Sequence, residues 1–143
     1  MEFNNLREQI VENKNSSTVN LVTSPADLHR LFEHALNSGD LDALVALYAF
    51  DAVLMAGSGM AEGINAIRQV LADYVAMEPH IEVTTRRVVE AGDTALLVAD
   101  WRFRGTARDG GVVSTSGTSI EVARRQPDGS WRYHIDLPYG LGE

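Results

Sequence analysis

The sequence of 143 residues contains no cysteine, which excludes disulfide bonds, thiolate zinc sites and cysteine nucleophiles. It is also short of basic residues, since 12 Lys and Arg stand against 20 Asp and Glu, for a net charge of −8. Nucleic acids and anionic membrane surfaces bind clustered positive charge, so neither is an expected partner. No apolar run approaches the roughly 20 residues that would span a bilayer. Residues 1–20 lack the basic start and apolar core of a secretory signal, and we expect a cytoplasmic protein.

What the sequence does contain is enough apolar material for a folded core, because 45% of its residues are hydrophobic and 22% are charged. The length suits one domain. We place that domain at residues 24–143 and interpret residues 1–23 as an N-terminal arm or linker. Phe3, Leu6 and Ile10 recur there at helical spacing. This arm is either a frayed tail or a segment that packs on a partner subunit.

Three helices are expected in the first half of the domain. Ser24 and Pro25 are a typical helix start, a side-chain cap followed by proline at the first helical position. This helix ends at residues 37–39, and Asp40 caps a second helix that extends to Tyr48. A short extended piece (53–55) and a glycine-rich loop (57–63) follow. The loop lacks the glycine spacing and the lysine of a phosphate-binding motif. A third helix is expected over 64–77.

After residue 80 the hydrophobic period changes to two, which is typical of strands. The pattern predicts strands over 81–89, 94–104, 112–125 and 130–137, separated by short turns rich in glycine and aspartate. Helices followed by long consecutive strands predict an α+β fold, with the helices on one face of an antiparallel sheet.

Three segments carry a family resemblance: residues 35–48 (ALNSGDLDALVALY), 62–67 (EGINAI) and 124–131 (RRQPDGSW). They resemble the nuclear transport factor 2-like superfamily, in its ketosteroid-isomerase-like and polyketide-cyclase-like (SnoaL-like) branch. The resemblance covers about residues 24–140. It implies a cone-shaped fold of three helices on a strongly curved antiparallel sheet, enclosing a pocket for a small, largely apolar molecule. It does not imply one activity, since this superfamily hosts isomerases, cyclases, hydrolases and non-enzymes.

The catalytic residues of the steroid isomerase do not transfer with the fold. That enzyme uses an aspartate base, and a tyrosine with a protonated aspartate as oxyanion donors. In an alignment through the shared Gly-Asp-Leu-Asp segment, the tyrosine position falls on Phe32 and the base position on Ala56. The second acid falls near Glu121. Phe32 and Ala56 are therefore expected to line the pocket without carrying its chemistry.

The last strand is expected to supply the polar chemistry. The resemblance places His134 and Asp136 on the pocket side, and antiparallel pairing across the turn at 126–129 adds Glu121. A histidine between two carboxylates can shuttle a proton, so these three are the candidate catalytic residues. The alternative is a purely structural ion pair. The opposite face of this strand is the more apolar one, and it carries Trp131, Tyr133, Ile135 and Leu137. That conflict is resolved if the convex sheet face is buried in a homodimer.

Four further residues are candidates for ligand binding. The resemblance turns Leu97, Ala99 and Trp101 inward, where Trp101 is either a stacking wall for a ring or ordinary core. Tyr48, at the end of the second predicted helix, could offer its hydroxyl at the pocket mouth or pack in the core. No His, Asp or Glu cluster has metal-ligand spacing, so neither a metal nor another cofactor is expected.

Two functions remain open at this stage. The first is a cofactor-independent isomerase, cyclase or hydrolase that acts on a small apolar substrate without the steroid isomerase's own catalytic set. The alternative is a non-catalytic ligand-binding or oligomeric accessory domain.

Overall fold

The computed structural model describes residues 21–57 and 59–142, and the predicted N-terminal helix lies outside these ranges. A 3-10 turn η1 (Pro25–Asp27) leads into α2 (Leu28–Asn37), followed by α3 (Leu41–Val45) and α4 (Ile64–Ala76). The strands are β1 (Tyr48–Ala56), β2 (Gly59–Glu62), β3 (His80–Ala91), β4 (Thr94–Thr106), β5 (Val112–Arg125) and β6 (Trp131–Leu137). Within the described ranges, no helix is long and apolar enough to cross a membrane.

The helix caps follow the sequence signals. Ser24 accepts a hydrogen bond from the Ala26 backbone N–H at 3.3 Å, and Asp40 accepts one from Ala43 at 3.1 Å. The second helix is shorter than predicted, because it ends at Val45 and Tyr48 begins β1. At this point the Leu47 carbonyl accepts a hydrogen bond from the Tyr133 N–H at 2.8 Å. Pairing with a strand far along the chain thus overrides the local helical pattern.

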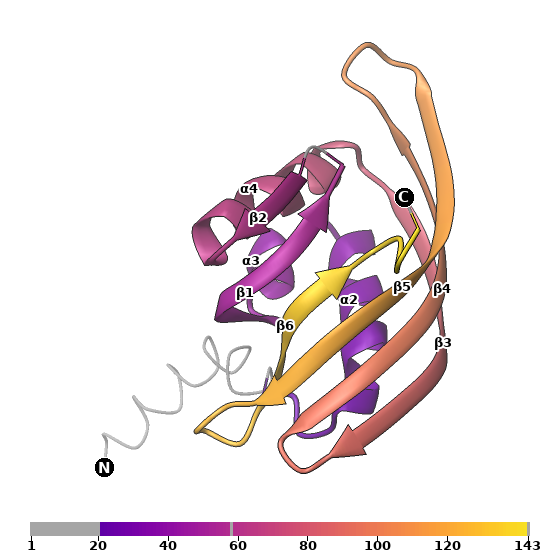
Figure 1. The fold of residues 1–143 in the computed structure, drawn as a ribbon. Coiled ribbons are helices and arrows are strands. Elements are labelled where there is room, and N and C mark those ends of the chain that lie inside the picture. The colour runs from indigo at the N-terminus through magenta and orange to yellow at the C-terminus, as the bar shows by residue number, and fades with distance from the viewer. Residues whose placement is uncertain (1–20, 58, 143) are drawn as a thin grey trace, which may run out of the picture.

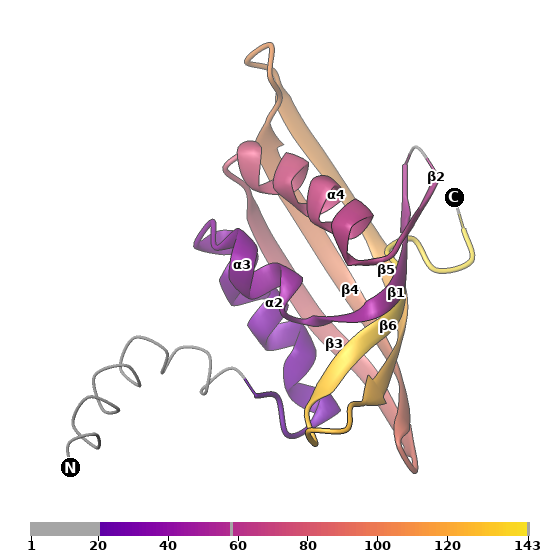
Figure 2. The same cartoon turned by 90° about the vertical axis from the view of Figure 1, so that its left-hand side faces the viewer.

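The six strands form one sheet in the order β2-β1-β6-β5-β4-β3. The α+β prediction is confirmed, and the three helices of the described residues lie on one side of the sheet (Figures 1 and 2). One pairing departs from the antiparallel sheet we expected, since β1 runs parallel to β6 and the sheet is therefore mixed. The glycine-rich loop also contains more structure than expected, because β2 returns along β1 as a hairpin.

The core lies between this helical layer and the inner face of the sheet. Leu28 and Leu36 of α2 pack there with Leu71 of α4 and Leu97 of β4, and all are fully buried. Burial of each leucine side chain contributes about 1.5–3 kcal/mol. The core holds the helices at a fixed distance from the strands that carry the polar residues of the site.

A β-bulge in β6 decides which side chains of the last strand face inward. Ala123 of β5 pairs with Tyr133 and its neighbour Val122 pairs with Ile135, so His134 is the extra residue. The bulge reverses the alternation of faces. Tyr133 before it and Asp136 after it are both buried, whereas Ile135 is 37% exposed. The conflict between an apolar and a polar face is thus resolved within one chain, without a partner subunit.

Candidate functional site

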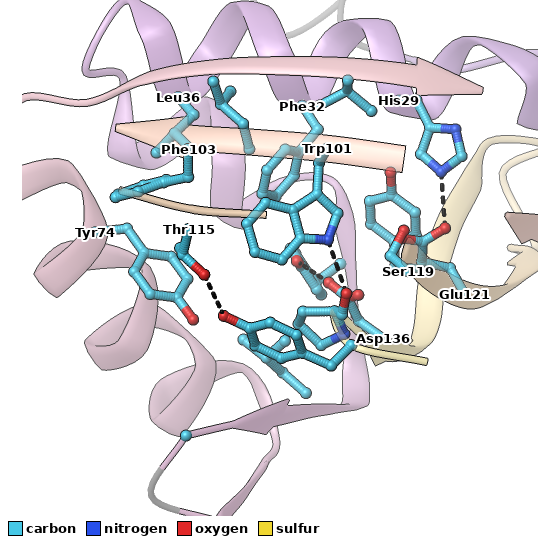
Figure 3. Close-up of a pocket in the computed structure, with 18 of the residues that line it drawn as sticks. His29, Phe32, Leu36, Tyr74, Trp101, Phe103, Thr115, Ser119, Glu121 and Asp136 are labelled. Atoms are coloured by element: carbon cyan, nitrogen blue, oxygen red, sulfur yellow. Dashed lines mark hydrogen bonds and ion pairs between the residues drawn. The ribbon is translucent and has the colours of Figure 1, made fainter. Parts of the chain in front are cut away.

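A cavity of about 310 Å³ lies between the helices and the sheet. Figure 3 shows Phe103 and Tyr74 at one end and His29, Ser119 and Glu121 at the other, with Trp101 between them. The volume is about twice that of an engineered cavity of ~150 Å³ that binds benzene, so it suits a molecule of one or two rings. No Lys or Arg is among the lining residues that the structure describes.

The polar part of the cavity is built on two neighbouring strands. Glu121 of β5 stands directly opposite Asp136 of β6 in the ladder. Both side chains line the cavity, and the two residues are only 5% and 6% exposed. Directly opposite residues of an antiparallel pair have Cβ atoms about 5 Å apart. Two carboxyl groups at that separation in a dry site do not both ionise readily.

The pKa of Asp136 is changed by its burial and by the nearby Glu121. Burial, followed by the negative charge of Glu121, raises the pKa of Asp136 from 3.8 to about 8. The Tyr48 hydroxyl donates to Asp136 Oδ2 at 2.6 Å and acts in the opposite direction. Asp136 is therefore mostly protonated near pH 7. Its Oδ1 atom makes no hydrogen bond within residues 21–57 and 59–142, so a proton on it is available to a ligand.

Glu121 has a partner of its own in His29, which lies in the first turn of α2. His29 Nε2 and Glu121 Oε1 are 2.7 Å apart, and His29 Nδ1 lies 2.7 Å from the Thr85 hydroxyl on β3. His29 is only 4% exposed. An ionised Glu121 accepts a hydrogen bond from the Nε2–H of His29, and this bond fixes the orientation of both side chains. The cavity thus holds two hydrogen-bonded pairs, Tyr48 with Asp136 and His29 with Glu121.

Tyr48, Tyr74 and Tyr133 also line the cavity. Burial, together with nearby carboxyl groups, raises the pKa values of Tyr48 and Tyr133 well above the ordinary range. The same causes raise the pKa of Tyr74 to about 12. All three therefore stay protonated at any physiological pH and can donate hydrogen bonds. The tyrosine hydroxyls contribute polarity without adding negative charge.

Trp101 is held in a fixed position on the cavity wall by the segment after β6. Its indole N–H donates to the Pro138 carbonyl at 2.7 Å, and the Tyr139 ring meets it edge-on at a centroid distance of 5.3 Å. The Tyr139 hydroxyl lies 3.2 Å from that of Thr115. A Cβ atom at Gly117 would come within 3.1 Å of both rings, so a larger residue there would push against them.

The structure brings together most of the candidate residues, but not all. Phe32, Tyr48, Trp101, Glu121 and Asp136 line the cavity; Ala56, Leu97 and Ala99 do not. Leu97 and Ala99 face inward but are fully covered by other core side chains. Ala56 lies near the end of β1, where it pairs with Gly59, and its neighbour Gly57 lines the cavity instead. The catalytic and binding roles assigned to these residues stay predictions.

The placement of His134 in the pocket is wrong. As the bulged residue of β6 it does not line the cavity, and its Nε2 atom lies 3.8 Å from the exposed carboxylate of Asp51. Strict period-two counting fails in this strand because a bulge shifts the register by one residue. Nothing in the local sequence marks that bulge.

His29 is one of several lining residues that were not predicted from the sequence, and it forms a hydrogen bond with the candidate catalytic residue Glu121. One signal was available, because positions 29, 32 and 36 share a helix face and the other two carry Phe32 and Leu36. A histidine on the apolar face of a helix needs a buried partner, and here that partner is Glu121. Among the described residues, no group of three or more His, Asp or Glu could hold a metal ion.

The fold, with its cavity between the helices and the sheet, places this protein in the NTF2-like class, the cone-shaped fold that the sequence resemblance implied. The chain belongs to the SnoaL-like domain family, whose model matches residues 28–134. No protein of curated function matches the sequence.

Several solved structures share the fold. An NTF2-like superfamily protein from Salmonella enterica has a TM-score of 0.74 at 17% identity, covering 90% of this chain and 94% of that one. A ketosteroid isomerase-like protein from Erwinia carotovora has a TM-score of 0.71 at 20% identity, covering 82% and 94%. A candidate aromatic ring hydroxylase from Novosphingobium aromaticivorans has a TM-score of 0.68 at 25% identity, covering 82% and 87%.

Proposed function

We propose that this protein is a cofactor-independent enzyme of the isomerase or cyclase type, which acts by general acid–base catalysis. Its substrate is a small, neutral, largely apolar ring compound that carries a carbonyl or hydroxyl oxygen. The observation that carries the proposal is the pair of opposed carboxyl groups in the cavity, Glu121 and Asp136. Paired titratable groups in unlike environments are the usual basis of an acid and a base in one site.

The two carboxyl groups take different roles in this proposal. Protonated Asp136 donates a hydrogen bond from Oδ1 to the substrate oxygen and stabilises the negative charge that develops there. Ionised Glu121, oriented by His29, takes a proton from a carbon next to the carbonyl carbon. Glu121 then delivers a proton, either the same one or one exchanged with water, to a different carbon, and a double bond shifts. In a cyclisation the carbanion instead forms a C–C bond to a second carbonyl carbon, and the proton goes to the oxygen of that carbonyl. This reaction needs no oxidant, reductant or metal ion, because it only moves a proton and rearranges bonds within the substrate.

The lining of the cavity supports a neutral substrate. A carboxylate or phosphate would meet two carboxyl groups and no Lys or Arg among the described lining residues. The aromatic side chains of Phe32, Trp101 and Phe103 suit the faces and edges of a ring. The substrate oxygen is thus expected next to Asp136, with its apolar body towards Phe103.

The experiment is a thermal-shift screen of one- and two-ring ketones, enones and phenols, followed by NMR of each stabilising compound for conversion by the enzyme. Glu121→Gln and Asp136→Asn are each expected to reduce turnover by about 10²–10⁴-fold, the usual contribution of a positioned acid or base. Asp73→Asn, at an exposed position of α4, is the matched control and keeps full turnover. A compound that fills the cavity without conversion by the wild type would favour the non-catalytic alternative, a ligand-binding domain.

We further propose that the outer face of the sheet holds a second copy of this chain. Five apolar residues form one continuous row across five strands of that face, each directly paired with the next in the ladder: Val89, Leu96, Val122, Ile135 and Val53. Val89, Leu96 and Ile135 are 48%, 41% and 37% exposed. Such a row is a typical centre for an interface between subunits. The wild type is expected to sediment as a dimer at micromolar concentration and Ile135→Asp as a monomer, and a monomeric wild type overturns this proposal.

A further inference from the structure

We propose that His29 and Thr85 form a proton-exchange path between Glu121 in the cavity and the solvent beyond the edge of the sheet. This inference rests on the proposed function, in which Glu121 takes up a proton from the substrate. It gives that proton a way out that does not use the cavity mouth.

The geometry of the path is a chain of two short hydrogen bonds. Glu121 Oε1 lies 2.7 Å from His29 Nε2, and His29 Nδ1 lies 2.7 Å from Thr85 Oγ1. The histidine itself is buried, at 4% exposure, whereas Thr85 is exposed to solvent. The imidazole ring therefore spans the wall between the cavity and the outside of the protein.

The position of Thr85 in the sheet explains how the path reaches water. Thr85 lies on β3, which is the edge strand of the sheet. A β-bulge follows it, because Thr85 pairs with Ala99 and Arg87 with Val98. Bulges bend a strand locally and redirect its side chains. Thr85 thus contacts His29 on α2 and is still exposed.

The chemistry of the three groups allows a proton to pass with both hydrogen bonds kept. In the first state a protonated Glu121 donates to Nε2, and Nδ1–H donates to the Thr85 oxygen. Glu121 then gives its proton to Nε2, the Nδ1 proton passes to Thr85, and the hydroxyl releases a proton to water. In the second state Nε2–H donates to the Glu121 carboxylate and the Thr85 hydroxyl donates to Nδ1. One proton has left the cavity, and every donor and acceptor still has a partner.

The neighbouring charged side chains have partners of their own and do not interrupt the two hydrogen bonds of the path. Glu33 of α2 accepts a hydrogen bond from the Val83 backbone N–H at 3.1 Å, and Arg86 of β3 pairs with Asp100 at 3.4 Å. On the cavity side the titratable neighbour of Glu121 is Asp136, whose hydrogen bond comes from Tyr48. A proton on His29 is therefore exchanged through Glu121 or through Thr85.

The test needs no substrate, because it measures how fast the His29 ring N–H exchanges with water. The full chain is labelled with ¹⁵N-histidine, and the exchange rate is read by NMR magnetisation transfer from water. Thr85→Val is expected to slow this exchange by about tenfold or more, since it then requires a local opening of the structure. Thr85→Ser keeps the hydroxyl and is expected to restore the wild-type rate.

Two features keep the result interpretable. Valine is favoured in strands and Thr85 is exposed, so Thr85→Val is expected to fold. Thr84→Val, at an exposed position of the same strand, is the matched control. An unchanged exchange rate in Thr85→Val overturns the path and shows that the proton leaves through the cavity. The acid–base function would then still stand or fall on the turnover of Glu121→Gln and Asp136→Asn.

Discussion

Replacing Asp136 by asparagine is expected to change how the stability of the protein depends on pH. Burial and the charge of Glu121 raise the pKa of Asp136 from 3.8 to about 8 in the folded state. Between these values the folded protein holds a proton that the unfolded chain has lost. The free energy of unfolding therefore falls as pH rises through this window, and this contribution is fully present only below about pH 4.

The size of the effect follows from the width of the window. Each pH unit contributes about 1.4 kcal/mol, so the titration of Asp136 is expected to lower the free energy of unfolding of the wild type by about 4 kcal/mol between pH 5 and pH 8. That is a large part of the 5–15 kcal/mol that typical domains have. The asparagine side chain introduced by Asp136→Asn cannot ionise, and its amide oxygen can still accept the Tyr48 hydroxyl. The variant should therefore lack this slope and exceed the wild type in stability at pH 9.

The assay is urea unfolding of both proteins at pH 5, 7 and 9, followed by tryptophan fluorescence. The difference between the two proteins isolates Asp136 together with its interaction with Glu121, because the remaining titrating groups are shared. Asp73→Asn, an exposed carboxylate on α4, should run parallel to the wild type. Parallel curves for Asp136→Asn and the wild type would refute the raised pKa and remove the acid from the proposed mechanism.

Three further predictions follow from the same contacts. Tyr48→Phe removes the hydrogen bond that lowers the pKa of Asp136, so the pH-dependent loss of stability should extend to higher pH. Glu121→Gln removes a negative charge and should move that loss to lower pH, though not to the ordinary value, because burial is the larger cause. Both shifts are read from the same unfolding series. Gly140→Ala should lower the free energy of unfolding by about 1 kcal/mol or more, because φ is +62° and the new Cβ would lie 3.0 Å from the Thr118 carbonyl.

The fold could be predicted from the sequence because the patterns that indicate it are local and repeated. The cap at Ser24 and the turn at 126–129 depend on residues next to each other in the chain. Each long strand of the second half also repeats its pattern several times, so one irregular residue does not hide it. The parallel pairing of β1 with β6 depends on contacts across about 80 positions, and a local pattern cannot reveal it.

The site could be predicted only in part, and its two failures have different causes. Antiparallel pairing across the turn at 126–129 predicts Glu121 on the polar side of the last strand. It stands directly opposite Asp136 only because of the bulge, since unbroken counting from the Arg125–Trp131 pair would place it opposite Ile135. His134 was misplaced because a single bulged residue inverts the faces of the strand before it. His29 was missed because its partners lie on β3 and β5, far away in sequence. A single sequence does not show which side chains of distant elements pair with one another.

The cost of Asp136 to stability is itself an argument for a chemical role. An asparagine there would accept the same hydrogen bond from Tyr48 and would never carry a charge next to Glu121. A purely structural explanation of this position therefore favours asparagine, and the pH-dependent loss of stability has no structural benefit to offset it. Proteins keep such locally unfavourable groups mainly where activity requires them. A buried acid that can donate a proton to a ligand, opposite a base that can accept one, is a reason for Asp136 that packing does not supply.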